Sequence, residues 1–137
     1  MKVTRTRITV RYKETDQMGI AHHSNYYPWF EVARTQFFKE LGFSYRDIEQ
    51  EGILLPLIET GCHYKAPARY DDSLIIETTI KEFKGLRLTF GYKVLNEATN
   101  QLLAEGKTVH VFTNARMKPI NIKKDNKEVY EALMAVI

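Results

Sequence analysis

A chain of 137 residues, 44% hydrophobic and 27% charged, has the length and composition of one globular domain, so we expect a single domain over residues 1–137. The net charge of +3 is too small to indicate nucleic-acid binding, and no apolar run reaches the ~20 residues of a membrane span. The single cysteine, Cys62, excludes an internal disulfide, and no signal peptide is visible, so we expect a cytoplasmic protein.

The first predicted element is a β-strand over residues 4–13, where side chains alternate with period two between a face in water and a buried face. The face that we expect to be buried carries Thr6, Ile8, Val10 and Tyr12. Alternation therefore turns Tyr12 inward, immediately before a turn at Asp16 and Gly19.

From Ser24 the apolar spacing becomes helical and continues as a wide stripe until Gly42, which favours the left-handed conformation that ends a helix. The stripe consists of Tyr26, Trp29, Phe30, Ala33, Phe37 and Leu41. We expect Ser24 or Asn25 to cap this helix. A second, short helix is predicted over about residues 44–52, with Ser44 as its cap.

Four more strands are predicted after the short helix, over residues 54–66, 73–83, 86–95 and 101–114. The connections among the last three are short enough for antiparallel hairpins. Residues 125–137 predict a terminal amphipathic helix. This order of elements indicates an α+β fold, in which a roughly five-stranded antiparallel sheet wraps around the long aromatic helix.

Asp16 is the strongest candidate for chemistry. A carboxylate at a turn between a strand and a helix can act as a general base toward water or attack an acyl carbon directly. The alternative is that Asp16 only closes an Asx-turn ahead of Gly19. No serine-nucleophile elbow, phosphate-binding loop or paired-cysteine motif points to other chemistry, and Cys62 is predicted to be a structural thiol.

His23 lies at the approach to the long helix, whose first N–H groups are unpaired and carry partial positive charge. These groups could stabilise a thioester or ester oxygen as it gains negative charge, while His23 donates a hydrogen bond or orients water. His22 and His23 could instead be polar loop residues. A metal site with Asp16 is a further reading, but adjacent histidines rarely bind one ion well, so we expect no metal.

Tyr12, if it points inward near Asp16, could hydrogen-bond the carboxylate or the substrate, or could be a core tyrosine whose hydroxyl reaches the rim. The motif Tyr12-x-x-x-Asp16-x-x-Gly19-x-x-x-His23-x-Asn25-Tyr26-x-x-Trp29-x-Glu31 resembles the 4-hydroxybenzoyl-CoA thioesterase family of hot-dog-fold proteins, in particular its Tol–Pal-associated acyl-CoA thioesterase branch. The resemblance covers nearly the whole chain, because the order of strands and helices also agrees.

The resemblance implies that Asp16 is the catalytic aspartate and that His23 and Tyr12 stand where that branch has its histidine and tyrosine. It implies an acyl-CoA thioesterase without a cofactor. A different hot-dog branch keeps its catalytic acid at the position of Glu31, which we expect to be structural here. Aryl-CoA members tend to carry an aromatic residue at the position of His23, so His23 favours aliphatic or general acyl-CoA.

The resemblance also implies homodimers whose sheets join edge to edge, often paired into homotetramers, with active sites at the subunit interface. An open sheet that leaves its edges uncovered agrees with this. The phosphates of CoA would require cationic side chains. The candidates are Lys65, Arg69, Lys84, Arg87, Arg116 and Lys118.

Two other functions stay open. A hot-dog dehydratase or hydratase acting on acyl-carrier substrates would pair a histidine with an acid across the interface, which is not the pattern of the Asp16 turn. A non-catalytic module would use the same pocket to bind an acyl group, an acyl carrier or a partner protein. Within the thioesterase reading, Asp16 could form a covalent anhydride or activate water.

Overall fold

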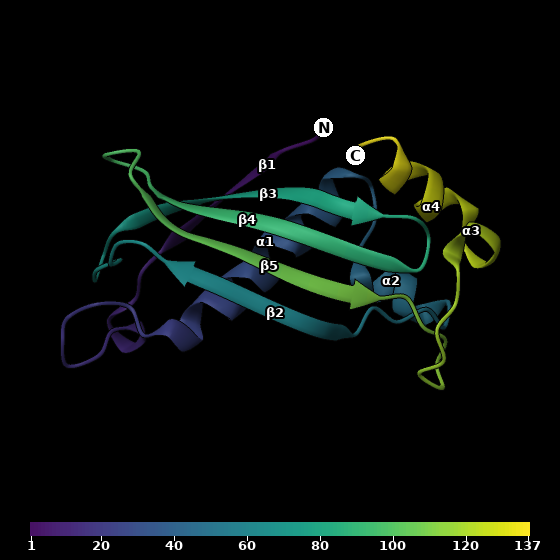
Figure 1. The fold of residues 1–137 in the computed structure, drawn as a ribbon, viewed down its shortest axis with the longest axis horizontal. Coiled ribbons are helices and arrows are strands. Elements are labelled where there is room, and N and C mark those ends of the chain that lie inside the picture. The colour runs from purple at the N-terminus through teal and green to yellow at the C-terminus, as the bar shows by residue number, and fades with distance from the viewer.

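A five-stranded antiparallel sheet packs across the long helix α1 in the computed structural model, which describes residues 1–137 (Figure 1). The strands are β1 (Thr4–Thr9), β2 (Leu57–Tyr64), β3 (Ser73–Phe83), β4 (Arg87–Asn96) and β5 (Leu102–Val111). The helices are α1 (Tyr26–Glu40), α2 (Tyr45–Gln50), α3 (Ile122–Asp125) and α4 (Lys127–Met134). The predicted α+β hot-dog fold is confirmed. No helix is both long and apolar enough to span a bilayer.

The strand order in the sheet is β1-β3-β4-β5-β2, so β2 is an edge strand and not a neighbour of β3. Tyr64 of β2 pairs with Ala104 of β5, while Thr4 of β1 pairs with Thr78 of β3 at the opposite edge. The sequence predicted four strands in antiparallel succession, which holds for β3, β4 and β5 only. Hairpin-length turns join those three, whereas residues 65–72 carry the chain from one side of the sheet to the other.

Helix α1 is fixed on the sheet by its aromatic stripe, as predicted. Phe30 stacks on Tyr92 of β4 with ring centroids 4.2 Å apart and an angle of 9° between the planes. Gly106 of β5 is a glycine for a steric reason, because a Cβ there would lie 2.5 Å from the Phe30 ring. Phe37 and Phe38 are fully buried further along the helix. Each such side chain contributes roughly 1.5–3 kcal/mol through burial, so the position of α1 on the sheet is tightly defined.

The ends of the helices agree only in part with the sequence prediction. Ser44 caps α2, since its Oγ accepts from the N–H of Asp47 at 3.1 Å, and Gly42 has a φ of 92°. Neither Ser24 nor Asn25 caps α1, so that prediction is wrong. Asn25 uses its side-chain amide to donate to two carbonyl oxygens of the preceding loop instead, and a short 3₁₀ turn, His23–Asn25, leads into the helix. The terminal helix predicted over residues 125–137 is α4, and α3 is an additional short helix immediately before it.

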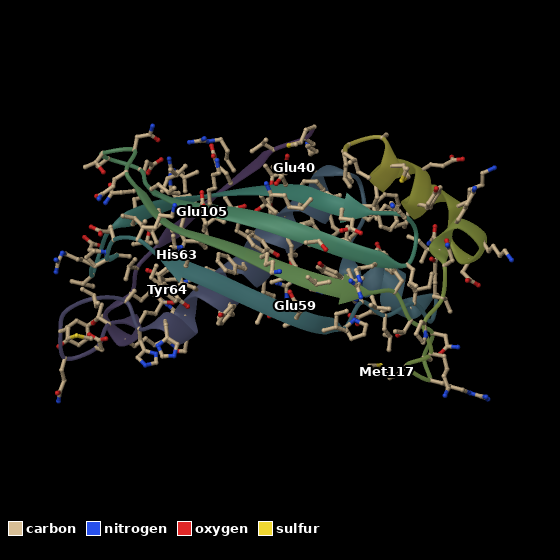
Figure 2. The ribbon with its side chains drawn as sticks, viewed as in Figure 1. Glu40, Glu59, His63, Tyr64, Glu105 and Met117 are labelled. Carbon is tan, nitrogen blue, oxygen red and sulfur yellow. The ribbon has the colours of Figure 1, made fainter.

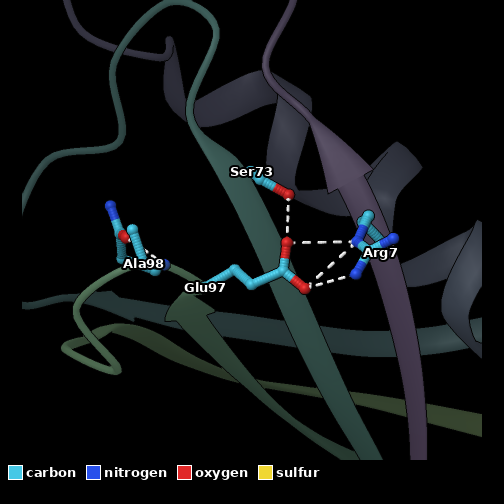
Figure 3. A network of polar contacts seen from close by, with 5 residues as sticks. Arg7, Ser73, Glu97 and Ala98 are labelled. Atoms are coloured by element: carbon cyan, nitrogen blue, oxygen red, sulfur yellow. Dashed lines mark hydrogen bonds and ion pairs between the residues drawn. The ribbon is translucent and has the colours of Figure 1, made fainter.

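An ion pair outside the core holds the first edge of the sheet (Figure 3). The Glu97 carboxylate accepts from the Arg7 guanidinium of β1, with Nε 3.1 Å from both carboxylate oxygens, and from Ser73 Oγ at 2.7 Å. Because Glu97 follows β4 and Ser73 begins β3, this cluster ties three strands together at one end. It lies at the end of the sheet where Thr9 of β1 pairs with Ser73 of β3.

The first strand is shorter than predicted. It ends at Thr9, Val10 is the last buried residue of the alternating face, and Tyr12–Glu14 form a 3₁₀ turn. Tyr12 is 77% exposed, and its ring packs edge-on against Tyr70 at 5.6 Å. The prediction that Tyr12 points inward is therefore wrong. Glu14 is the buried residue, because hydrogen bonds between Arg11 and Glu14 close a turn where the strand was expected to continue.

Glu14 connects this turn to α1. Its Oε2 accepts from the indole N–H of Trp29 at 3.0 Å and from the Arg11 guanidinium at 3.2 Å, and its Oε1 accepts from the Arg11 main-chain N–H at 2.7 Å. Its own carbonyl oxygen accepts from the N–H of His22 at 2.8 Å and from the Asn25 amide at 2.9 Å. Burial would raise the pKa of the Glu14 carboxyl, but the donors of Arg11 and Trp29 outweigh it and leave the pKa below its ordinary value.

We expect Glu14→Gln to lower the free energy of unfolding by about 1–3 kcal/mol at neutral pH, because the charge-assisted bonds are lost. A carboxyl whose pKa is lowered by folding contributes stability that is fully present above its ordinary pKa of about 4.3 and disappears as the pH falls through the folded pKa. Urea unfolding should therefore show that the difference in the free energy of unfolding between Glu14→Gln and wild type becomes smaller as the pH falls from 7 to 3.

Glu49→Gln is the matched control, since Glu49 is exposed on α2 and its side chain makes no hydrogen bond. Its effect should be small throughout this pH range. If the free energy of unfolding of Glu14→Gln differs from wild type by the same amount down to pH 3, the Glu14 carboxylate is not the source of this stability.

Candidate active site

Asp16 lies in a tight loop that closes on itself. The main-chain N–H of Asp16 donates to the Ile20 carbonyl, and the N–H of Gly19 donates back to the Asp16 carbonyl, both at 2.9 Å. Gly19 has a φ of 77°, a backbone conformation that residues other than glycine rarely adopt. Asp16 Oδ1 accepts from the N–H of Met18 at 2.9 Å, which is the Asx-turn considered from the sequence. Oδ2 accepts no hydrogen bond from the protein, so it is available for chemistry.

The crossing segment between β2 and β3 holds this loop from the other side. The N–H of Ala21 donates to the Ala68 carbonyl at 2.7 Å, and Ile20 and Arg69 form an isolated β-bridge. Together with the bonds to the Glu14 carbonyl, these contacts fix the loop both to the sheet and to the start of α1. The carboxylate of Asp16 is thus carried by a short loop anchored at both ends.

A cavity of about 420 Å³ opens beside Asp16, between the loop and the end of β2. Its lining consists of Asp16, Met18, Ile20, Ala21, His23, Tyr26, Tyr64, Lys65, Ala66 and Pro67. Figure 2 shows Tyr64 at the end of β2 on the side of this loop. Asp16 and His23 therefore share one cavity. Tyr12, the third residue predicted for the site, is not part of the lining.

The two adjacent histidines have different surroundings. His22 Nδ1 accepts from the N–H of Ser24 at 3.2 Å and lies 2.8 Å from Ser24 Oγ, so His22 caps the short turn that leads into α1. His23 makes no such bond and lines the cavity. The main-chain N–H of His23, at the start of that turn, donates to no acceptor in the protein. No three His, Cys, Asp or Glu side chains gather as metal ligands would.

An aromatic wall borders the cavity. Tyr26 and Tyr64 meet edge-to-face with ring centroids 4.9 Å apart. Burial raises the pKa of Tyr26 to about 12, so this tyrosine stays neutral at neutral pH. Cys62 lies next to this pair, partly buried against the core, and burial raises the pKa of its thiol. A protonated, packed thiol agrees with the structural role predicted for Cys62.

The sequence did not assign Glu14, Tyr64 or Lys65 to the site. A glutamate directly before the Asp16 turn, with a tryptophan at the inward face of the following helix, was the available signal for Glu14. Lys65 was one of six cations considered for the phosphates of CoA, and it is the one that lines the cavity. Its ammonium lies 3.6 Å from the carboxylate of Glu105, a long, exposed contact that leaves it available to a ligand.

Comparisons with known proteins identify the family. The family described as the thioesterase-like superfamily matches residues 10–133. YneP of Bacillus subtilis (strain 168) is 38% identical over 125 residues, which cover 90% of each chain. The acyl-CoA thioester hydrolase YbgC of Escherichia coli O157:H7 is 33% identical over 118 residues, covering 85% of this chain and 87% of that one.

Solved structures give the same result. A DHNA-CoA thioesterase from Staphylococcus aureus has a TM-score of 0.95 at 34% identity, covering 99% of this chain and 91% of that chain. The gentisyl-coenzyme A thioesterase BH1999 has a TM-score of 0.81 at 27% identity, covering 96% of this chain and 99% of that chain. The family match includes the Asp16 loop, α1 and strands β2 to β5. The chain belongs to the thioesterase-like superfamily and is a thioester hydrolase of the hot-dog fold.

Proposed function

We propose that this enzyme hydrolyses acyl-CoA thioesters to free acid and CoA in the cavity beside Asp16. The observation that carries the proposal is the shared cavity of Asp16 and His23, in which one oxygen of the carboxylate is held by Met18 and the other makes no bond to the protein. The activities of YbgC and of the Staphylococcus aureus and BH1999 enzymes, all of which are CoA thioester hydrolases, support the choice of CoA. We assign the chain to the Tol–Pal-associated branch and to the cytoplasm.

Asp16 acts in one of two ways. As a general base it takes a proton from water, the hydroxide adds to the thioester carbon, and the carbon–sulfur bond breaks to release the CoA thiolate, which is then protonated. As a nucleophile its free oxygen attacks the same carbon, the thiolate leaves, and water hydrolyses the mixed anhydride. In both routes negative charge develops on the carbonyl oxygen. The unpaired N–H of His23 and its imidazole are the donors proposed to stabilise it.

The other side chains of the cavity bind the substrate. The aromatic and aliphatic lining around Tyr26 and Ile20 suits an acyl group. Lys65 is our choice for the contact with a phosphate of CoA. Tyr12 is exposed and does not line the cavity. We therefore propose that it contacts bound substrate at the rim. His23 favours aliphatic or general acyl-CoA, and no cofactor is required.

Hydration and binding without turnover are the competing functions. A dehydratase or hydratase would add water to crotonyl-CoA without releasing free thiol, and a binding module would release no thiol from any acyl-CoA. A thiol-release assay over short, long and aryl acyl-CoA substrates therefore separates the three functions. It also measures the preference for the acyl group.

Asp16→Asn should lower kcat/KM for thiol release by roughly 10²- to 10⁴-fold, because an amide is neither a general base nor a competent nucleophile. The near-identical shape should leave folding and oligomeric state unchanged, as checked by circular dichroism and sedimentation. Asp71→Asn, an exposed aspartate in the loop before β3 whose side chain makes no hydrogen bond, is the matched control. Retention of most of the activity by Asp16→Asn would overturn the assignment of Asp16.

The adjacent histidines provide a second test. His23→Gln should lower kcat/KM by roughly tenfold or more, because the imidazole that lines the cavity is lost. His22→Gln should remain close to wild type, since His22 only caps the turn with Ser24. Equal losses in the two variants would show that the histidines support the loop and do not act on the substrate.

We further propose that the protein is a homodimer, or a tetramer of paired dimers, joined through β2. This strand pairs with β5 on one side only, and its other edge presents unpaired main-chain groups. Leu57 and Ile58 at its start are 47% and 51% exposed. Exposed apolar side chains on a free strand edge are the features of an edge-to-edge interface.

Ile58→Lys should shift the protein toward monomers in analytical ultracentrifugation, because a charged side chain on an edge strand opposes strand pairing. Leu86→Lys is the control, as Leu86 is exposed in the turn between β3 and β4, neither of which pairs with β2. A dissociation constant that is the same in wild type and both variants would place the interface elsewhere.

A further inference from the structure

A second and larger cavity, of about 870 Å³, lies between α1 and α2. Its walls are formed by Glu31, Arg34, Thr35 and Lys39 of α1, by Leu55, and by the residues at and after the start of α2, which are Ser44, Tyr45, Arg46, Asp47, Glu49 and Gln50. None of these residues lines the Asp16 cavity, so the two cavities are separate. Nothing in the proposed thioesterase reaction uses this cavity, which we call the α1–α2 cleft. Its volume is within the ~300–1,000 Å³ typical of sites for small molecules.

The guanidinium of Arg34 belongs to the lining of the cleft and is half-buried. It lies beside the hydroxyl groups of Tyr45 and Tyr92 and close to the buried imidazole of His110. The ion pairs of the protein join other cations to other carboxylates, and none of them involves Arg34. Arg34 is therefore a partly buried positive charge that forms no ion pair within the protein.

The hydroxyl and imidazole groups beside Arg34 supply no negative charge. Burial, together with the nearby Arg34 guanidinium, lowers the pKa of His110 to about 4, so the imidazole is neutral at neutral pH. His110 Nε2 lies 2.9 Å from Thr108 Oγ1, which in turn lies 2.6 Å from the Tyr92 hydroxyl. Burial raises the pKa of Tyr45, so its hydroxyl also stays neutral. The side chains that bury Arg34 are thus polar but uncharged, and the negative group on the same helix face is Glu31 at the rim.

The hydroxyl of Tyr45 is buried and makes no hydrogen bond of normal geometry. A buried donor without an acceptor and a guanidinium without an anion both carry a desolvation cost. An anionic oxygen placed between them would remove both costs, because arginine donates in a planar fork that matches carboxylate and phosphate oxygens. Two neighbouring donors without an anionic acceptor define the chemistry of the missing partner.

The rim of the cleft is formally neutral, which limits how a ligand is attracted. Lys39 and Arg46 add two positive charges to that of Arg34, while Glu31, Asp47 and Glu49 contribute three negative charges. Long-range attraction for an anion is therefore weak, and recognition depends on direct contact with Arg34. Glu31 lies three residues before Arg34 on the same helix face and is the internal competitor for the guanidinium.

We propose that the α1–α2 cleft binds a small organic anion, whose carboxylate or phosphate group is held by the Arg34 guanidinium and the Tyr45 hydroxyl. This binding site goes beyond the proposed thioesterase function. Both products of thioester hydrolysis carry such a group, since the free acid is a carboxylate and CoA contains phosphates. We therefore expect the cleft to bind one of these two classes of anion, carboxylates or phosphates.

The test is a titration of the full-length protein with benzoate and, separately, with inorganic phosphate at constant ionic strength, followed by backbone NMR shifts of residues in α1 and α2. We expect saturable binding of at least one anion, and the arm that saturates identifies the class. Arg34→Gln should weaken that binding roughly tenfold or more. Arg46→Gln, which removes a cation from the rim of the same cleft, is the matched control and should change it little.

Two further variants complete the design. Glu31→Gln should tighten binding by removing the internal competitor, and Asp16→Asn should leave it unchanged, so failure of the thioesterase proposal would not affect the result. Absence of saturable binding in both arms, or equal weakening by Arg34→Gln and Arg46→Gln, would overturn the inference. If Arg34→Gln does not fold, Tyr45→Phe decides, because unchanged affinity in that variant excludes the proposed contacts.

Discussion

The buried carboxylate of Glu14 joins the loop that carries Asp16 to the helix that begins beside it. Three donors, two from Arg11 and one from Trp29, hold the side chain, while its carbonyl oxygen holds the start of the turn before α1. A carboxylate so enclosed must stay paired, because a buried charge without donors costs several kcal/mol. The position of Asp16 relative to α1 therefore depends on an acid that does no chemistry.

The sequence predicted the fold well where periodicity decides the structure. The aromatic stripe of α1, the Ser44 cap and the hairpins from β3 to β5 all follow from local patterns and are confirmed. The motif also grouped Asp16 with His23, and both line one cavity. These features are local in the chain, so a single stretch of sequence contains the information needed to predict them.

Errors arose where tertiary contacts override a local pattern. Alternation continued formally to Tyr12, but the bonds between Arg11 and Glu14 replace the end of the strand by a turn and expose the tyrosine. Asn25 is a good capping residue, yet it donates to the carbonyl of Glu14. The edge position of β2 could not be read from hydrophobicity either, because pairing with β5 depends on a contact some forty residues away in the chain.

Tyr92 lies between the packed core and the α1–α2 cleft, since its ring stacks on Phe30 and its hydroxyl lies beside Arg34. Spatial continuity does not by itself couple two sites, because coupling requires an element with two arrangements whose balance both ligands alter. Phe30 has no second arrangement available, as its ring is enclosed between Tyr92 and the bare backbone of Gly106. The close packing that positions α1 on the sheet therefore provides no two-state element at Phe30 that could couple the Asp16 cavity to the α1–α2 cleft.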